Sequence, residues 1–324
     1  MENGRDDIVN ALGKLTISDW LSKDRGRLIT SIRPNLIGPS ANPVTSKGGH
    51  VLLCSYNWLA SNSKAIYIHG GAPILKESVQ VPFTLTLDKG REMVDSNAFH
   101  SPASPFEPAF RATDPSHKFD DLDVLVNRNT LRKFFAICRG ASQERFRVNL
   151  FLQGSKTLII ERCEKKAVLH AKNRGGHSRA YGKNFEHACV HEPPGLTDSE
   201  CHHRVIQYDF GELSCAVRFE VDACKGSLGG ANIQVPVPGE DGNVQPAMSV
   251  SANPSMKLIR RGVVDPRVPL VELKSCKHHR KPLNSILPQL WFGRTASLVQ
   301  GIHKGGVFNA LHHTDVTADG GFEA

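Results

Sequence analysis

The clearest pattern along the chain is an alternation of apolar and polar positions over residues 213–223. Apolar side chains fall on every second position there, which is the period of a β-strand with one buried face. Such a strand turns Arg218, Glu220 and Asp222 to the opposite face. The pattern therefore predicts a strand that holds two carboxylates side by side.

A second stretch, residues 268–275, also has the period of a strand. It places Glu272 and Lys274 on one face and Val271 and Leu273 on the other. If the two strands are neighbours, three carboxylates and one ammonium group share a pocket. Clustered carboxylates repel one another unless a divalent cation neutralises them, so the two stretches together predict a magnesium or manganese site.

Further periodic segments predict a mixture of strands and helices around these two stretches. Ser, Pro, Asn and Gly separate them, and residues 96–116 are rich in Pro and aromatic residues, which is typical of a surface loop. The predicted strands are 51–54, 65–68, 81–85, 124–126, 146–152, 157–161 and 296–302, and the predicted helices are an amphipathic segment around residues 8–15, 131–138 and 283–294.

Composition describes a globular chain with a basic surface. The 324 residues are 40% hydrophobic, enough for a large core, and no apolar run approaches the roughly 18 residues of a membrane span. A net charge of +8 favours a polyanionic partner such as nucleic acid, although an excess of this size is also common without one. The eight cysteines show no CxxC spacing, which favours a reducing location in the nucleus or cytoplasm.

Two basic features bear on the substrate. Arg128 lies at a predicted strand-to-helix turn, where an arginine can hold a phosphate beside helix N–H groups, although a solvated arginine is the commoner outcome. Basic residues also dominate residues 257–281, around Glu272 and Lys274, which favours an anionic substrate. A cluster of histidines and cysteines over residues 187–203 raises the possibility of zinc, but its spacing fits no standard zinc motif.

Taken in order, these residues resemble the decapping and exoribonuclease family, in a divergent fungal branch. The resemblance spans residues 120–308. Asn127-Arg128-Asn129 replaces the Trp-Arg-Gly element of the family, and Leu131 and Lys133 still match the pattern that follows it. The matching elements are Gly-x-x-Phe-Glu at 182–186, Glu-x-Asp at 220–222, Glu-Leu-Lys at 272–274, and a Gln289-containing helix followed by an aliphatic strand at 298–301.

The resemblance implies an α+β fold in which helices flank mixed central β-sheets around a restriction-nuclease-like PD-(D/E)xK core. It implies hydrolysis of RNA 5′ ends that are incompletely capped, NAD-capped or unprotected, with Mg²⁺ or Mn²⁺ as cofactor. It also implies a role for each site residue. The metal ligands would be Glu186, Asp222, Glu272 and the Leu273 carbonyl, with Glu220 binding through a water. The catalytic residues would be Lys274, Gln289 and Glu220, and the substrate would contact Arg128, His203, Lys274 and Gln289.

The expected organisation has three parts: a divergent N-terminal part, residues 1–118, packed on the core; a nuclease core, 119–308, with a long insertion at 225–267; and an atypical C-terminal tail, 309–324. Two alternatives stay open. One is a non-catalytic relative that binds RNA or supports a separate 5′-to-3′ exonuclease. The other is a DNA-directed nuclease on the same fold.

Overall fold

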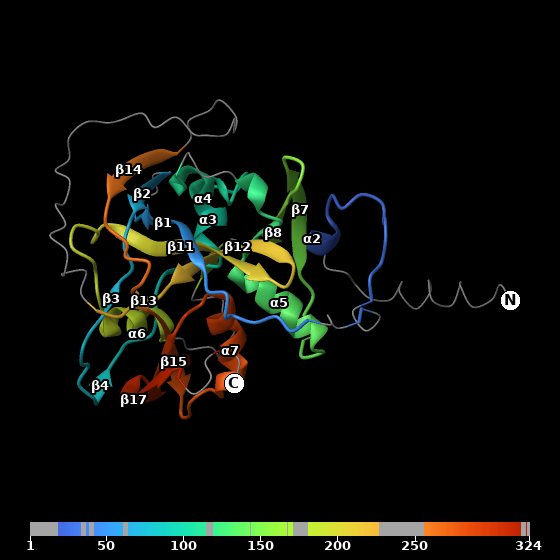
Figure 1. Cartoon of the computed structure of the whole chain (residues 1–324). Helices are drawn as coiled ribbons and strands as arrows, with labels where there is room; N and C mark the ends of the chain where they lie inside the picture. Colours follow the sequence, from blue (N-terminus) through green and yellow to red (C-terminus); the bar gives the residue numbers. More distant parts are fainter. Residues whose placement is uncertain are drawn as a thin grey trace.

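Two mixed β-sheets form the body of the protein (Figure 1). The structure is a computed structural model that describes residues 19–33, 37–38, 42–60, 64–114, 119–142, 144–166, 168–170, 181–226, 256–318 and 322. The amphipathic helix predicted around residues 8–15 and most of the predicted insertion, residues 227–255, lie outside these ranges.

The larger sheet has eight strands in the order β14-β2-β1-β11-β12-β6-β8-β7. Its central pairs are β1 with β11 and β11 with β12, both antiparallel, whereas β12 and β6 are parallel. The strands are β1 Val51–Leu59, β2 Ala65–His69, β6 Val124–Asn127, β7 Arg147–Gln153, β8 Thr157–Cys163, β11 Ser199–Phe210, β12 Leu213–Val221 and β14 Lys257–Arg261.

The smaller sheet has seven strands in the order β10-β3-β13-β15-β16-β17-β4. β15 and β16 are parallel, and β17 closes on β16 in antiparallel register. The strands are β3 Ile74–Leu75, β4 Phe83–Thr84, β10 Val190–His191, β13 Ala223–Cys224, β15 Leu270–Lys277, β16 Ser297–Lys304 and β17 Val307–Asp315; β5 Arg91–Met93 and β9 Val168–His170 form a separate pair.

The helices lie over the sheets rather than in a domain of their own (Figure 1). α4 packs on β1 and β2, α5 on β6 and β12, α6 on β15, and α7 against α5. None of the described helices is long and apolar enough to cross a membrane. The helices are α2 Asp19–Ser22, α3 Ser96–His100, α4 Glu107–Ala112, α5 Arg128–Cys138, α6 Gly182–Cys189 and α7 Leu283–Phe292, with a 3₁₀ turn at Phe119–Asp121.

The first of the two patterned stretches is not a single strand. β12 ends at Val221, and β13 begins at Ala223 and pairs with β15 through Ala223 opposite Val271. Asp222 therefore lies where the chain passes from the larger sheet to the smaller one. The two stretches are neighbours as predicted, but only through this junction, because β12 itself belongs to the other sheet.

Both faces of β12 are buried along most of its length, which alternation alone did not predict. Residues 215–219 are all buried, including Arg218. The second face is covered because Phe106, from the turn that begins α4, packs over the Arg218 guanidinium at 4.2 Å from its ring centroid. Burial of a charged residue requires partners, and these bear on the site below.

The predicted segments at 51–54, 65–68, 124–126, 146–152, 157–161 and 296–302 all fall within or largely on observed strands, and both described helices predicted near the site, 131–138 and 283–294, are present. The predicted tail begins inside β17, whose residues 307–315 pair with β16. The three-part organisation stays a prediction.

Gly301 gives α6 its place against the smaller sheet. A β-carbon at this position would stand 2.3 Å from the ring of Phe185, which itself stacks on Phe308 at 5.0 Å. We expect Gly301→Ala to lower the free energy of unfolding by about 1–3 kcal/mol in a urea titration, because a rigid aromatic pair has to move. Adding Phe185→Leu should recover part of the loss. Equal stability of Gly301→Ala and the wild type would contradict this packing.

Candidate active site

Glu272, in the middle of β15, is the centre of the polar cluster that the sequence predicts. Its side chain is 2% exposed and accepts hydrogen bonds from Lys274 Nζ and Gln289 Nε2, and Arg128 Nη1 lies 3.3 Å from its second oxygen. Burial alone would raise the pKa of this carboxyl, but the adjacent Lys274 and Arg128 charges outweigh it and hold the pKa near 2. Glu272 is therefore an anion at any working pH.

Arg128 reaches Glu272 from the first turn of α5. The strand-to-helix turn at Asn127 places it there, and Gly293, after α7, leaves room for it, since a β-carbon on Gly293 would stand 3.0 Å from Arg128 Nη1. The guanidinium also packs over Phe219, 5.1 Å from the ring centroid. The solvated arginine that base rates favoured is wrong: Arg128 is fixed against the site by an ion pair.

Asp222 and Glu186 form the second part of the cluster. Asp222 accepts a hydrogen bond of 2.9 Å from the Leu273 N–H and lies 3.9 Å from Lys274 Nζ. Burial, followed by the charge of Glu272, raises its pKa to about 7. Burial, followed by the charges of Asp222 and Glu220, raises the pKa of Glu186 to about 9. Two of the carboxyls are thus poorly able to ionise together.

α6 carries Glu186, in its second turn, toward the strands. Asp88 caps the first turn of this helix by accepting from the N–H groups of Lys183 at 3.2 Å and Asn184 at 3.0 Å. Phe185 is fully buried against the smaller sheet, so the next residue, Glu186, is brought to the side of Asp222. The charges of Asp222, Glu220 and Lys274 all act on the pKa of Glu186, so Glu186 lies within electrostatic range of both patterned stretches.

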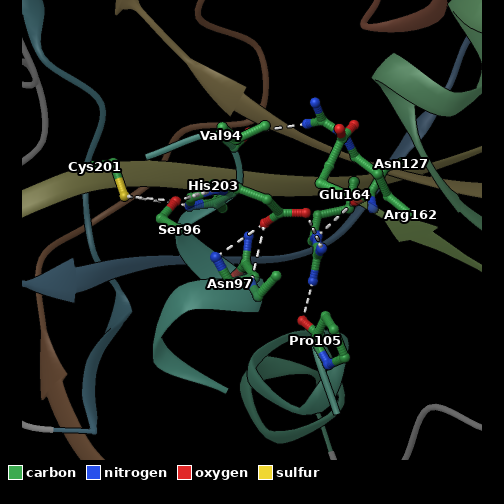
Figure 2. Close-up of polar contacts among 12 residues, drawn as sticks. Val94, Ser96, Asn97, Pro105, Asn127, Arg162, Glu164, Cys201 and His203 are labelled. Carbon is green, nitrogen blue, oxygen red and sulfur yellow. Dashed lines mark hydrogen bonds and ion pairs between the residues drawn. The ribbon is translucent and has the colours of Figure 1, made fainter. Parts of the chain in front are cut away.

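Glu220 and His203 face each other across β12 and β11, where they are register partners. Glu220 is exposed on one side, but surrounding protein atoms displace water from its carboxylate and raise its pKa. His203 is 4% exposed, stacks on Tyr56 at 5.3 Å and lies 3.5 Å from Ser96 Oγ. Figure 2 shows His203 beside Ser96 and Cys201. Its predicted contact with a nucleotide stays a prediction.

A buried network that sequence reasoning missed supports the site from behind. Arg218, 1% exposed, donates from Nε to Asn127 Oδ1 at 2.9 Å and from Nη1 to the Pro105 carbonyl, and its Nη2 lies 3.8 Å from Asp95. Figure 2 shows Pro105 and Asn127 in this network. Because Asn127 precedes Arg128, the network fixes the turn that presents Arg128. An arginine inside an otherwise apolar strand was the available signal.

The donor chemistry of the cluster fits a divalent cation. Carboxylates that raise a neighbour's pKa, as Asp222 does for Glu186 and Glu272 does for Asp222, have an excess of negative charge that a hard cation relieves. The described part of the chain nonetheless holds no group of three or more His, Cys, Asp or Glu side chains arranged to bind a metal ion. In this structure Lys274, Gln289 and Arg128 occupy the Glu272 carboxylate instead.

The raised pKa values predict how the stability of the metal-free protein, measured in the presence of a chelator, depends on pH. For Asp222 (3.8 to about 7) and Glu186 (4.5 to about 9) the folded state holds the proton more tightly than the unfolded state. The free energy of unfolding should therefore fall as pH rises from about 4 to 9. We expect the unfolding temperature in EDTA to drop by at least about 3 °C between pH 6 and 9. Glu186→Gln/Asp222→Asn should flatten this slope; an equal slope in both proteins would contradict the assignment.

Comparison with other proteins identifies relatives of this arrangement. A family model described as "Domain of unknown function (DUF8563)" matches residues 26–322. No curated protein matches the chain.

Solved structures share the fold at low sequence identity. The structure of Rai1 from S. pombe in complex with 3′-FADP has a TM-score of 0.50 and 11% identity, and covers 88% of this chain and 79% of that one. A mutant of the same protein, also with 3′-FADP, has a TM-score of 0.51 and 10% identity over the same shares. The protein thus has a Rai1-like fold of two mixed sheets with flanking helices.

Proposed function

The chain belongs to the family described as a domain of unknown function, DUF8563, and we propose that it is a divalent-metal-dependent hydrolase acting on RNA 5′ ends. The observation that carries this proposal is the convergence of Lys274, Gln289 and Arg128 on Glu272, with Asp222 against the same lysine. These contacts use side chains from the Glu-x-Asp, Glu-Leu-Lys and Gln289 elements of the family pattern, together with Arg128. The Rai1-like fold supports the same reading.

In the proposed site, Glu186, Asp222, Glu272 and the Leu273 carbonyl would hold Mg²⁺ or Mn²⁺, with Glu220 reaching the metal through a water. A cation bound there would neutralise the carboxylates and lower the pKa of water. We place these residues on a PD-(D/E)xK core, in which the Glu-Leu-Lys element at 272–274 supplies the carboxylate and the lysine.

The remaining side chains have electrostatic and positioning roles. Burial would lower the pKa of Lys274, but the carboxylates of Glu272 and Asp222 outweigh it and raise that pKa, so Lys274 stays an ammonium group at neutral pH. It therefore stabilises negative charge on the phosphoryl oxygens rather than accepting a proton. Gln289 orients the attacking water, and Arg128 holds the phosphate. Glu220, with its raised pKa and its exposure, is suited to accept the proton of the water as the P–O bond to that water forms and the P–O bond to the leaving nucleotide or cap fragment breaks.

The test is a panel of 5′-end-labelled RNAs that differ only in the first group: triphosphate, unmethylated cap, NAD and monophosphate. With magnesium or manganese, we expect release of a terminal nucleotide or cap fragment from at least one of them and a 5′-monophosphate RNA as the other product. Release should stop in EDTA. A single-stranded DNA of the same sequence tests the DNA-directed alternative. The nucleus and the cytoplasm are the proposed locations.

One observation favours the non-catalytic alternative. The Glu272 carboxylate is already bound by three donors, and the described residues hold no ready cluster of three metal ligands. A relative with this arrangement could bind RNA, or support a separate 5′-to-3′ exonuclease, without cleaving. Binding of the panel RNAs without any release, in either metal, would establish this alternative in place of the hydrolase.

A further inference from the structure

A basic cavity lies between α5 and α7, next to the proposed active site but outside it. Its volume is about 310 Å³, at the lower end of the roughly 300–1,000 Å³ of ligand sites. Residues of α5, of the following loop and of the first turns of α7 line it. The two helices pack side by side, and Figure 1 shows them below the larger sheet.

The same two helices line both the cavity and the active site. Arg128 of α5 contacts Glu272, and Arg132, one turn later on the same face, lines the cavity. Gln289 of α7 contacts Glu272, and Ser285, one turn earlier on the same face, lines the cavity. The cavity is therefore the next surface along α5 and α7 for a strand of substrate that extends from the Glu272 site.

The charges of the cavity lining are suited to a phosphate. Arg132, Lys133 and Arg139 line it with one carboxylate, Glu144. Lys133 is shared between Glu144 at 3.5 Å and Glu164 at 3.4 Å. Neither Arg132 nor Arg139 makes an ion pair with a carboxylate of the described ranges. Arg132 is also half-buried and lies near the like charges of Arg128 and Arg162. Its pKa is lowered first by burial and second by the charge of Arg128.

Aromatic and amide groups complete a surface that fits a nucleotide rather than a bare anion. Phe135 is 38% exposed at the cavity, with the Arg139 guanidinium 5.3 Å from its ring centroid. Phe146 lies opposite under Lys133, at 5.5 Å. Nucleobases stack on such rings and guanidinium planes, and Asn129 and Asn284 add hydrogen-bonding groups.

We propose that this cavity binds a ribonucleotide of the RNA strand downstream of the reacting 5′ end, with its phosphate on Arg132 and Arg139 and its base on Phe135. The inference rests on the proposed function, which sets the direction of the RNA from its 5′ end at the Glu272 site to the cavity. The basic residues of α5 would then hold the body of the RNA, while the Glu272 site acts only on its 5′ end.

The test measures binding of a fluorescent ten-nucleotide 5′-monophosphate oligouridylate in EDTA, so that affinity is read without cleavage. We expect Arg132→Gln/Arg139→Ala to weaken binding about tenfold. The slope of log K against log salt concentration should become shallower by about 0.7 for each lost phosphate contact. Because Arg132 is half-buried, a urea titration checks that the double variant still unfolds in one cooperative transition.

The matched control removes the same amount of charge elsewhere. Lys257 and Arg260 are exposed on β14, at the edge of the larger sheet, whereas Glu272 lies on β15 of the smaller sheet. These two members of the basic stretch 257–281 are therefore not part of the proposed site. Lys257→Ala/Arg260→Ala should bind with wild-type affinity and slope. Phe135→Leu keeps an apolar side chain but loses the stacking surface, and should weaken binding of oligouridylate at least threefold while leaving binding of inorganic polyphosphate unchanged.

The outcomes separate the cavity from the active site. Weaker binding in the α5 variant with no release from any RNA would support the cavity and overturn the hydrolase. Release from RNA with equal affinity in the wild type and the α5 variant would overturn the cavity and leave the hydrolase standing. Equal losses in the α5 and β14 variants, or equal effects of Phe135→Leu on RNA and polyphosphate, would show a general anion surface and overturn the nucleotide site.

Discussion

Glu272→Gln is expected to lower the rate of 5′-end release by about a thousandfold or more. The substitution keeps the shape of the side chain but removes the charge on which Lys274, Gln289 and Arg128 converge. Losing one fixed electrostatic group of an active site costs on the order of 10² to 10³ in rate, and Glu272 is also a proposed metal ligand. The measurement is single-turnover release from the best RNA of the panel in saturating manganese.

Loss of activity in Glu272→Gln alone would not separate chemistry from folding. The variant leaves Lys274 and Arg128 without their shared anion, at a cost of about 2–3 kcal/mol, below that of a fully buried pair because Lys274 is 24% exposed. Asp222→Asn resolves the ambiguity. It removes one charge from a repelling set, and its amide oxygen can still accept from the Leu273 N–H.

Asp222→Asn should therefore gain about 1 kcal/mol of stability in chelator at pH 7.5 while losing release as severely as Glu272→Gln. Opposite signs for stability and activity are difficult to obtain from a structural residue. Glu212→Gln, an exposed carboxylate in the turn between β11 and β12, is the control and should change neither property. Full activity in Asp222→Asn would remove Asp222 from the site.

Periodicity was sufficient to locate the chemistry because the strands that carry it are regular. The alternation over residues 213–223 and 268–275 put Glu220, Asp222, Glu272 and Lys274 on defined faces, and the structure brings Asp222, Glu272 and Lys274 together. The break at Asp222 could not be predicted. A strand that changes sheets keeps its period of two across the junction, so nothing local marks the change.

The position of Glu186 depends on contacts that local sequence does not encode. α6 is short, it begins with Gly182, and its first turn is capped by Asp88, from a loop far earlier in the chain. Its packing depends on the absence of a side chain at Gly301. The resemblance to a family supplied what periodicity could not, because an ordered set of motifs records such long-range contacts indirectly.

The buried polar groups behind the site could not be predicted from the sequence, for a related reason. Arg218 occupies a position that alternation assigns to the solvent face, but α3, α4 and the turn before α4 cover it. Whether the second face of a strand is covered depends on elements distant in sequence, here residues 95–107. The basic cavity between α5 and α7 was similarly invisible, since each helix contributes to it separately.

Arg218→Met is expected to lower the free energy of unfolding by at least about 3 kcal/mol. Methionine fills much of the same volume beside Phe106, so the loss measures charge and hydrogen bonding rather than a cavity. Burial raises the pKa of the Asp95 carboxyl, and the Arg218 guanidinium is the neighbour that does most to lower it. Arg218→Met removes that neighbour. Urea unfolding at pH 7 gives the value, and the deficit should shrink below about pH 4, where Asp95 is protonated in both folded and unfolded variant chains.

A double-mutant cycle with Asp95→Asn tests whether this is one network. Asp95 also caps α3 through the N–H groups of Asn97 and Ala98, at 3.0 and 3.3 Å, which asparagine can retain. Arg218→Met/Asp95→Asn should therefore be more stable than Arg218→Met alone, by about 1 kcal/mol or more. Additive losses would show that Asp95 and Arg218, 3.8 Å apart, do not depend on each other.

The same variant connects the network to the reaction. Arg218 Nε is the donor to Asn127 Oδ1, and Asn127 Nδ2 has no hydrogen-bond partner among the described residues, so the Asn127 side chain is held through its oxygen alone. We expect removal of Arg218 to loosen the turn that follows Asn127, so that Arg128 spends less time against Glu272. We expect Arg218→Met/Asp95→Asn, measured where it is fully folded, to raise KM for RNA more than it lowers kcat, because Arg128 grips the phosphate and does not take part in proton transfer. A loss confined to kcat would instead give Arg218 a role in positioning Glu220 and Asp222, the carboxylates that follow it along the chain.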